Sequence, residues 1–268
     1  MSLFHYTDAN AVKSILEFQK IWLTDVRFLN DSQEFHDGAR FIEAAIKKVA
    51  SQQEKGSFKH KACAYLEDMG SSFFQKTLHL EPRFVCSFST EKDLLSQWRS
   101  YGDYAIEFDR GEVRKYLNLV DCIYSDQLKE ESMEVAVDRA LAILGGGIKA
   151  HAVPERSEVD RVKQKLLAFC DVFKSQHFVE ESEVRSYESA SSYSENILYR
   201  AKGSLLIPYL SKDIPLKCVK AIHIGPVANQ DLAAVAMQMF LQKICIQNRG
   251  MGEIKIEVVK SGIPYRTL

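Results

Sequence analysis

The sequence contains no long hydrophobic run, and no stretch approaches the roughly 20 apolar residues that a membrane-spanning helix needs. Residues 1–20 also lack the uninterrupted apolar core of a secretory signal peptide, because Asp8, Lys13, Glu17 and Lys20 interrupt them. The composition is otherwise that of an ordinary globular protein, with 46% hydrophobic and 26% charged residues. These features predict a cytoplasmic protein with enough apolar side chains for a large core.

Cysteine pairs and a charge excess are also missing. The six cysteines are scattered without a C-x-x-C pair, and no two Cys or Cys/His ligands have the usual short zinc spacing. We therefore expect reduced, mostly buried thiols and no metal site. A net charge of −1 shows no overall excess of basic residues for binding nucleic acid, but it does not exclude a local basic patch on the surface.

No internal repeat and no change of composition marks a linker, so residues 1–268 are predicted to form one domain. Apolar periodicity predicts an α+β fold, with helices inserted between the strands of a split, mixed or antiparallel sheet. We expect strands at 2–7, 21–23, 104–108, 119–124, 216–224 and 254–259. We expect helices after Asp8, over 32–50, from Phe58 toward Phe73, over 129–144, about 157–173 and over 229–247.

Several helix ends carry their own signals. Asp8 is a good N-cap, and Asp31 followed by Glu34 resembles a capping box. Three glycines at 145–147 predict the end of the helix over 129–144. The helix over 229–247 is expected to place these residues inward: Leu232, Val235, Ala236, Met239, Phe240 and Ile244.

The stretch from Phe84 to Asp109 is the segment around which we expect the ligand site to be built. It begins as an apolar strand, breaks into the hydroxyl-rich turn Ser87-Phe88-Ser89-Thr90, and continues as a short aromatic helix that Gly102 ends. A strand, a polar turn and an aromatic helix together make a suitable wall for a flat ligand. The aromatic faces of Trp98 and Tyr101 can stack on a base or nicotinamide ring, and Arg99 can bind a phosphate. The alternative is that Trp98 belongs to the core face of this helix and that Arg99 is solvated.

Two further groups are candidates for chemistry. His5 on the N-terminal strand, beside Tyr6 and Thr7, can donate hydrogen bonds to a ribose, or it can merely satisfy a backbone carbonyl. Glu181 and Glu183 point to one side of an extended backbone, where two carboxylates raise one pKa or favour a cation between them. The alternative for this pair is an acidic, solvated entrance to a strand.

The motifs together resemble one bacterial family, the domain-of-unknown-function 2971 family. The resemblance covers nearly the whole chain and rests on blocks that stand in the same order: HYT, LTDVRFLNDSQEF, CSFS with LLSQWRSYG, FVEESEVR, IHIGP and SGIPYR. A typical member has Trp where this chain has Val184. The arrangement is more distantly similar to ADP-ribosyltransferases of the His–Tyr–Glu type, which hold NAD in a split-sheet α+β domain.

That second resemblance implies roles for particular residues. His5 would contact the nicotinamide-side ribose, with Thr7 near the amide, and Tyr101 or Trp98 would stack on the nicotinamide. Glu183 would be the catalytic glutamate, while Glu181 orients the acceptor, or the two exchange roles. The remaining expected NAD-binding residues are Tyr6, Ser87, Ser89 and Arg99. No metal would be needed.

The sequence therefore favours an NAD-dependent ADP-ribosyltransferase that acts as a toxin-like or anti-phage effector on a protein or nucleic acid, with an inhibitory partner protein as a further expectation. A non-catalytic nucleotide- or partner-binding module of the same fold is the second hypothesis. A metal-dependent nuclease that uses Glu181, Glu183 and an aspartate such as Asp103 is the third. The first hypothesis requires that His5, Tyr101 and Glu183 converge on one cleft.

Overall fold

The structure is a computed structural model that describes residues 1–29, 32–66, 81–149, 153–248 and 255–264. Three parts of the sequence analysis fall outside these residues: the capping box at Asp31, the continuation of a helix toward Phe73, and the last two residues of the SGIPYR motif.

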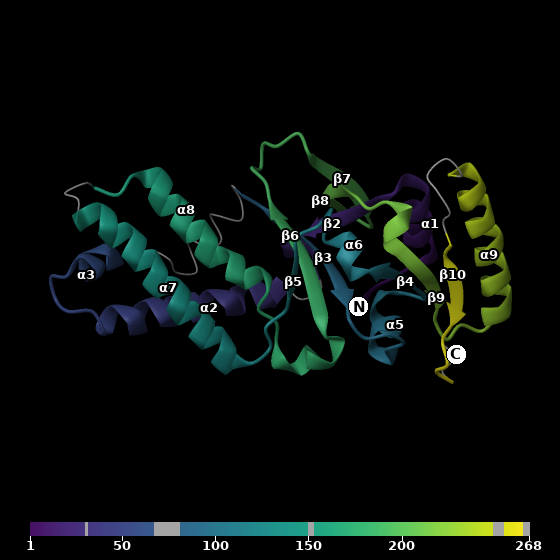
Figure 1. The fold of residues 1–268 in the computed structure, drawn as a ribbon, viewed down its shortest axis with the longest axis horizontal. Helices are drawn as coiled ribbons and strands as arrows, with labels where there is room; N and C mark the ends of the chain where they lie inside the picture. The colour runs from purple at the N-terminus through teal and green to yellow at the C-terminus, as the bar shows by residue number, and fades with distance from the viewer. Residues whose placement is uncertain (30–31, 67–80, 150–152, 249–254, 265–268) are drawn as a thin grey trace.

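A mixed sheet forms one half of the molecule (Figure 1). Its strands follow the order β10-β9-β4-β1-β3-β2-β8-β7, and β6 pairs with both β3 and β5. All neighbours are antiparallel except β9 and β10. The predicted α+β class with a mixed sheet is confirmed. The strands are β1 (Ser2–Thr7), β2 (Lys20–Asp25), β3 (Arg83–Ser89), β4 (Tyr104–Asp109), β5 (Leu119–Asp121), β6 (Glu183–Ser189), β7 (Ile197–Lys202), β8 (Leu205–Asp213), β9 (Val219–Ile224) and β10 (Glu257–Lys260).

The sheet is nearly divided at β3. Strand β1 pairs with β4 along its whole length, but it meets β3 only through Phe4 and Ser89. Strand β2 meets β3 only at its last residues, Thr24 and Asp25. Strand β3 instead pairs along its length with β6. Because β1, β2 and β3 diverge, side chains rather than ladder hydrogen bonds occupy the space between them.

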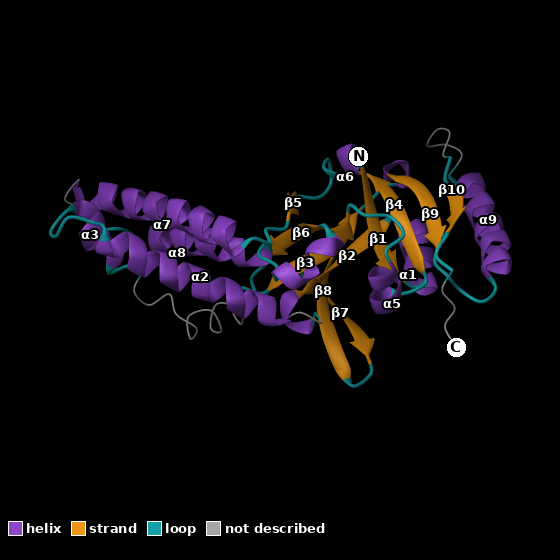
Figure 2. Cartoon of the chain, turned by 90° about the horizontal axis from the view of Figure 1, so that it is seen from below, coloured by secondary structure: helices purple, strands orange, loops and turns teal. Residues whose placement is uncertain are grey.

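The other half of the molecule is a bundle of helices that we call the helical lobe (Figure 2). The lobe consists of α2 (Ser32–Ser51), α3 (Phe58–Cys63), α7 (Asp126–Lys149) and α8 (Arg156–Leu167). Helices α2 and α3 are inserted between β2 and β3, whereas α7 and α8 are inserted between β5 and β6. Their buried apolar residues, among them Ile42, Ile46, Val137 and Leu141, form a core separate from that of the sheet.

Further helices surround the sheet. They are α1 (Ala9–Phe18), α5 (Leu95–Tyr101), α6 (Arg110–Val113) and α9 (Gln230–Gln247), with 3-10 turns at Val26–Phe28, Ala168–Asp171, Gln176–Glu181 and Leu216–Cys218. Helix α1 begins as predicted, because Asp8 accepts a hydrogen bond from the Ala11 amide at 2.8 Å.

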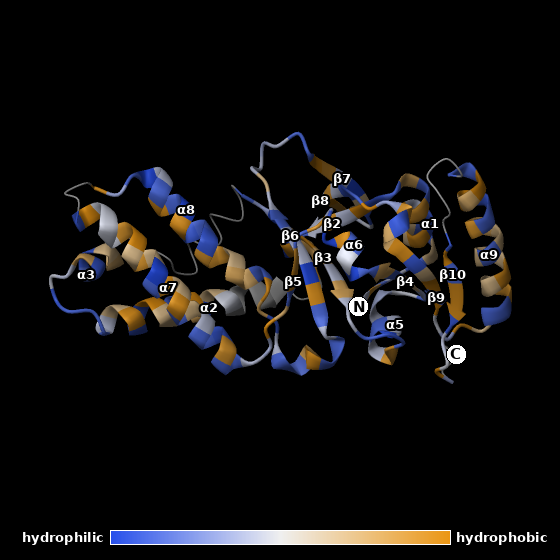
Figure 3. Cartoon of the chain, viewed as in Figure 1, coloured by the Kyte–Doolittle hydropathy of each residue, from blue (hydrophilic) through white to orange (hydrophobic). Residues whose placement is uncertain are grey.

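The predicted inward face of α9 is largely wrong. Leu232, Val235 and Met239 are exposed, whereas Met237, Leu241 and Ile244 are buried against the sheet. Figure 3 shows hydrophobic residues along the visible side of this helix. Apolar residues occur around much of α9, so their spacing does not identify which face is packed.

Helix α7 also departs from expectation, because it continues through the three glycines to Lys149. A Cβ atom on Gly145 would lie 3.2 Å from the backbone of Phe58 at the start of α3, whereas one on Gly146 would meet nothing within 4 Å. Gly145 therefore permits a close approach of two helices, and it does not end one.

Gly145 and Gly146 provide a test of this close approach and its control, because they are neighbours in the same helix and only Gly145 contacts α3. We expect Gly146→Ala to raise the free energy of unfolding by about 0.5–1 kcal/mol through helix propensity alone. Gly145→Ala gains the same propensity but overpacks the contact with α3, so we expect a net loss of about 1 kcal/mol. Urea denaturation of both variants measures the difference, and equal stabilisation by both would contradict the close approach.

Candidate functional site

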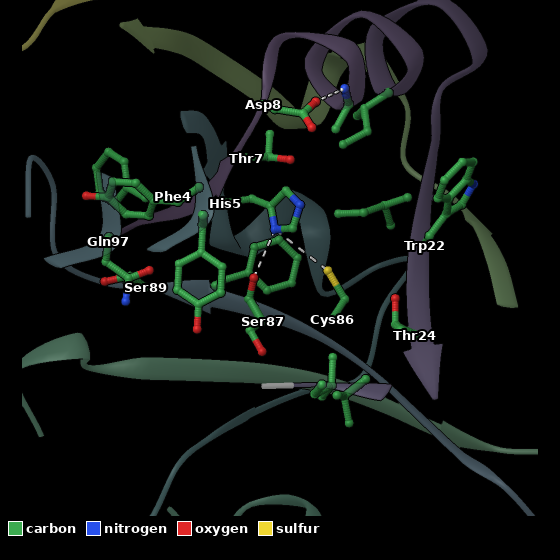
Figure 4. Close-up of a pocket in the computed structure, with 18 of the residues that line it drawn as sticks. Phe4, His5, Thr7, Asp8, Trp22, Thr24, Cys86, Ser87, Ser89 and Gln97 are labelled. Carbon is green, nitrogen blue, oxygen red and sulfur yellow. Dashed lines mark hydrogen bonds between the residues drawn. The ribbon is translucent and has the colours of Figure 1, made fainter. Parts of the chain in front are cut away.

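A cavity of ≈ 530 Å³ lies where β1, β2 and β3 diverge beneath α1. Its walls come from segments far apart in sequence, and they include His5, Thr7, Ser87, Tyr101, Glu181 and Glu183. His5, Tyr101 and Glu183 thus converge on one cleft. Figure 4 shows His5 near the middle of the cavity, between Ser87 and Cys86 on β3 and Thr7 on β1.

The ring of His5 is fixed by the strand across from it. Its Nδ1 atom lies 2.9 Å from the carbonyl oxygen of Ser87 and 3.9 Å from the sulfur of Cys86. Burial lowers the pKa of His5, although the hydrogen bond to Ser87 acts in the opposite direction. A neutral ring that donates from Nδ1 keeps Nε2 as an acceptor. His5 therefore offers a hydrogen-bond acceptor at Nε2, in contrast to the predicted donor role.

Several expected ligand-binding residues have structural partners. The hydroxyl of Tyr6 donates to the Glu91 carbonyl oxygen at 3.0 Å and accepts from the Leu94 amide at 3.2 Å. Burial raises the pKa of Tyr6 to about 12. The hydroxyl of Ser89 donates to the carbonyl oxygen of Glu181 at 2.7 Å. Both side chains border the cavity, but their polar atoms hold the turn after β3 in place.

The aromatic helix α5 presents only one of its two candidate aromatic residues to the cavity. Trp98 is buried, packs edge-on against Tyr6 with ring centroids 4.7 Å apart, and donates to Asp93 at 2.9 Å. It is absent from the described cavity lining, as is the exposed Arg99. The structure therefore places Trp98 in the core, as the alternative hypothesis held. Tyr101 borders the cavity, is 39% exposed, and is the aromatic residue of this helix that can meet a ligand.

Glu181 and Glu183 share a cation. The Lys174 ammonium lies 2.8 Å from Glu181 and 2.6 Å from Glu183. Glu183 also accepts from Arg185, at 2.6 Å from Nε and 3.2 Å from Nη2. The backbone between the two glutamates is not extended, because Ser182 has a φ of 43°. The predicted cation between the carboxylates is thus present, and it is a lysine of this chain.

Glu183 stays ionised because of these partners. Burial alone would raise its pKa, but the positive charges of Arg185 and Lys174 outweigh burial and hold the pKa at about 2. Both cations are themselves buried. Two buried cations around one carboxylate make Glu183 a structural anchor as well as a candidate catalytic group.

A second set of contacts ties the carboxylate pair to the helical lobe. Arg83 on β3 forms a bidentate ion pair with Asp171, which follows α8, and the carbonyl of Asp171 accepts from Arg185 at 3.0 Å. The hydroxyl of Tyr124 accepts from the Glu183 amide at 2.6 Å. None of these partners was predicted. The sequence gives no signal of the Arg83 pair, because Asp171 lies 88 residues away, and the proximity of Arg185 to Glu183 does not reveal that both are buried.

An adjoining cavity of ≈ 270 Å³ shares Thr24, Ser87, Tyr101, Glu183 and Arg200 with the first. Its remaining walls include Asp171, Lys174, Arg185 and Lys202, so it is lined by charged side chains from both the sheet and the segment that follows α8. The two cavities together form an elongated cleft.

The donor set of the nuclease hypothesis does not come together. Asp103 is absent from the described lining of either cavity, and its carbonyl accepts from the Gly225 amide at 2.8 Å. Among the described residues, no group of three or more His, Cys, Asp or Glu side chains is placed to hold a metal ion.

Comparison of the chain with protein-family models, curated proteins and solved structures finds no match. Within the described part of the chain, no helix is both long and apolar enough to cross a membrane. The family resemblance therefore rests on the sequence motifs.

The ion pairs of Glu183 predict a specific pH dependence of stability. We expect Glu183→Gln to lower the free energy of unfolding by about 3 kcal/mol at pH 7, because Lys174 and Arg185 lose a buried partner. A carboxylate with a depressed pKa stabilises the fold above its unfolded value near 4.5, and this contribution is lost as the pH falls toward 2. The difference between wild type and variant should therefore shrink between pH 4.5 and pH 2.

Denaturant titrations across this pH range provide the measurement. Glu188→Gln on the same strand is the control, because Glu188 pairs with Lys212 at a half-exposed site, where we expect a loss below about 1 kcal/mol. A Glu183 variant as stable as the control at pH 7 would show that the buried network contributes nothing.

Proposed function

We propose that this protein binds NAD in the elongated cleft and transfers its ADP-ribosyl group to an acceptor. The observation that carries the proposal is the convergence of His5, Tyr101, Glu181 and Glu183, from three separate segments, on one cavity. The cavity volume of ≈ 530 Å³ lies within the range of small-molecule and cofactor sites. The motif resemblance described above supports the same reaction, and a protein or nucleic acid is the proposed acceptor.

The reaction requires three contributions from the site: a stacking surface, a hydrogen-bond acceptor and a negative charge. Tyr101 offers a ring face for the nicotinamide, and Nε2 of His5 accepts a hydrogen bond from a hydroxyl of the adjoining ribose. The bond between nicotinamide and ribose then breaks, the electron pair leaves with nicotinamide, and positive charge develops on the ribose. A preorganised carboxylate near that ribose stabilises the developing charge without reorganising.

The two glutamates are suited to different parts of this reaction. Glu183 is ionised, is held by Arg185 and Lys174, and borders the cavity. Glu181 is less buried and uses Oε2 for Lys174. We assign electrostatic stabilisation of the ribose to Glu183, and orientation of the acceptor to Glu181.

One observation favours the second candidate, a binding module without chemistry. Lys174 and Arg185 neutralise much of the charge of Glu183, which weakens the field that it exerts on a ribose. A module of this kind would bind NAD in the same cleft and release no nicotinamide.

Binding is tested first by calorimetry with NAD. We expect His5→Ala and Tyr101→Ala to weaken binding about tenfold each, because each removes one hydrogen bond or one stacking face. Trp98→Ala should instead lower thermal stability, because it leaves a cavity beneath Tyr6. Wild-type affinity in both the His5 and Tyr101 variants would exclude this placement of the ligand.

Turnover separates the two candidates. We expect wild-type protein to release nicotinamide and to label a component of a bacterial lysate from tagged NAD. Glu183→Gln should lower nicotinamide release about 10²–10³-fold with NAD affinity little changed. Glu181→Gln should impair labelling more than NAD hydrolysis.

Because Glu183→Gln also removes an anchor of the fold, its activity must be measured where circular dichroism shows that the variant is folded. Glu188→Gln again serves as the control. Full labelling by the folded Glu183 variant would make the catalytic assignment wrong, whereas NAD binding without any release or labelling by wild type would favour the binding module.

A further inference from the structure

The two parts of the cleft differ in the sign of their charges. The described lining of the larger cavity contains three carboxylates, those of Asp8, Glu181 and Glu183, against the cations of Lys20 and Arg200. The smaller cavity has the opposite balance, with four cations, Lys174, Arg185, Arg200 and Lys202, against the carboxylates of Asp171 and Glu183. Glu181 and Glu183 are already paired with Lys174 and Arg185, so the difference between the two parts comes from the cations that have no carboxylate beside them in the described part of the chain.

Two of the four cations in the smaller cavity are matched by carboxylates of the protein. Lys174 and Arg185 pair with Glu181 and Glu183, as described above. Arg200 and Lys202 differ, because neither makes an ion pair within the described ranges. They stand two residues apart on β7 and both border this cavity, so they present their charges on the same side of the strand.

The guanidinium of Arg200 is held in place by neutral groups. It lies over the ring of Trp22, 5.4 Å from the ring centroid, and its Nη2 atom donates to the hydroxyl of Thr24 at 3.2 Å. Its Nε atom is buried and has no hydrogen-bond partner among the residues that the structure describes. Stacking fixes the plane of the guanidinium, while most of its donors lack acceptors within that part of the chain. An oriented arginine without a carboxylate, at the wall of a cavity, is suited to an oxyanion of the ligand.

We propose that the smaller cavity is a phosphate subsite in which Arg200 and Lys202 bind the diphosphate of a nucleotide ligand. The larger cavity, bordered by Tyr101, Glu181 and Glu183, then receives the ribose and the positively charged ring at the other end of that ligand. The ligand therefore has one orientation in the cleft, set by the position of Arg200 and Lys202. The naming of NAD as this ligand rests on the proposed function, whereas the phosphate subsite rests on Arg200, Lys202 and their surroundings.

Calorimetry with four ligands tests this assignment: NAD, ADP-ribose, inorganic pyrophosphate and nicotinamide riboside, of which the last has no phosphate. We expect Arg200→Gln to weaken binding of NAD and ADP-ribose about 10-fold to 100-fold, as for the loss of a charged hydrogen-bonding group. Affinity for nicotinamide riboside should change less than about twofold. Arg200→Lys keeps the charge but loses the planar fork, so its affinity should lie between those of wild type and Arg200→Gln.

Lys202→Gln should weaken the same phosphate-bearing ligands by a smaller factor. The control is Lys55→Gln, which removes one positive charge from an exposed turn between α2 and α3, outside the described lining of both cavities. Melting temperatures identify any variant that fails to fold. If Arg200→Gln fails to fold, Arg200→Lys and Lys202→Gln decide, and wild-type affinity for ADP-ribose in both would overturn the subsite.

The outcomes separate the subsite from the proposed function. Wild-type protein that binds ADP-ribose in an Arg200-dependent manner but does not bind NAD would support the subsite and contradict the proposed reaction. Equal NAD affinity in wild type and folded Arg200→Gln would overturn the subsite and leave the proposed reaction standing. No binding of NAD, ADP-ribose or pyrophosphate to wild type would overturn both.

Discussion

The arrangement of the cleft depends on one buried ion pair, between Lys174 and Glu183. Lys174 belongs to the segment that follows the helical lobe, and Glu183 begins the strand that pairs with β3. Arg185 and the bidentate pair of Arg83 with Asp171 extend the same network along this boundary. A charge buried without its partner is strongly unfavourable, so neither side of the boundary can move independently. The lobe is therefore joined to the sheet by charges that also form one wall of the cleft.

Much of the fold follows from local patterns in the sequence. The strand with His5, the cap at Asp8 and the helix over 32–50 were predicted because alternation, capping and helical spacing each act over a few residues. The wrong predictions concern contacts between distant segments. Three glycines indicate a helix end until a neighbouring backbone requires one of them in the helix, and the apolar residues of α9 show their packed face only once the sheet is present.

In the candidate site, too, residues with distinctive local motifs were predicted, whereas residues that act through contacts between segments were not. His5, Tyr101, Glu181 and Glu183 were found because their types and motifs are distinctive, and they share a cavity in the structure. Lys174, Arg185 and Arg200 were missed, although they set the electrostatics of the cleft. Their importance comes from burial and from contacts such as those of Arg185 with Asp171 and of Arg200 with Thr24, 14 and 176 residues away, which spacing along the chain does not encode. Trp98 was predicted to bind the ligand because it has a large aromatic ring, but that ring packs against Tyr6 in the core.

The origin of the helical lobe from two separate insertions has a consequence for biosynthesis. Ile42 and Ile46 on α2 pack in one core with Val137 and Leu141 on α7, so the first insertion stays incomplete until almost 100 further residues have been made. At ribosomal rates of about 5–20 residues per second, that interval lasts roughly 5–20 seconds. During this time the apolar side of α2 lacks the partners that α7 and α8 supply, and it is available to chaperones or to aggregation. The lobe is thus a part of the nascent chain whose folding must wait for synthesis of its second half.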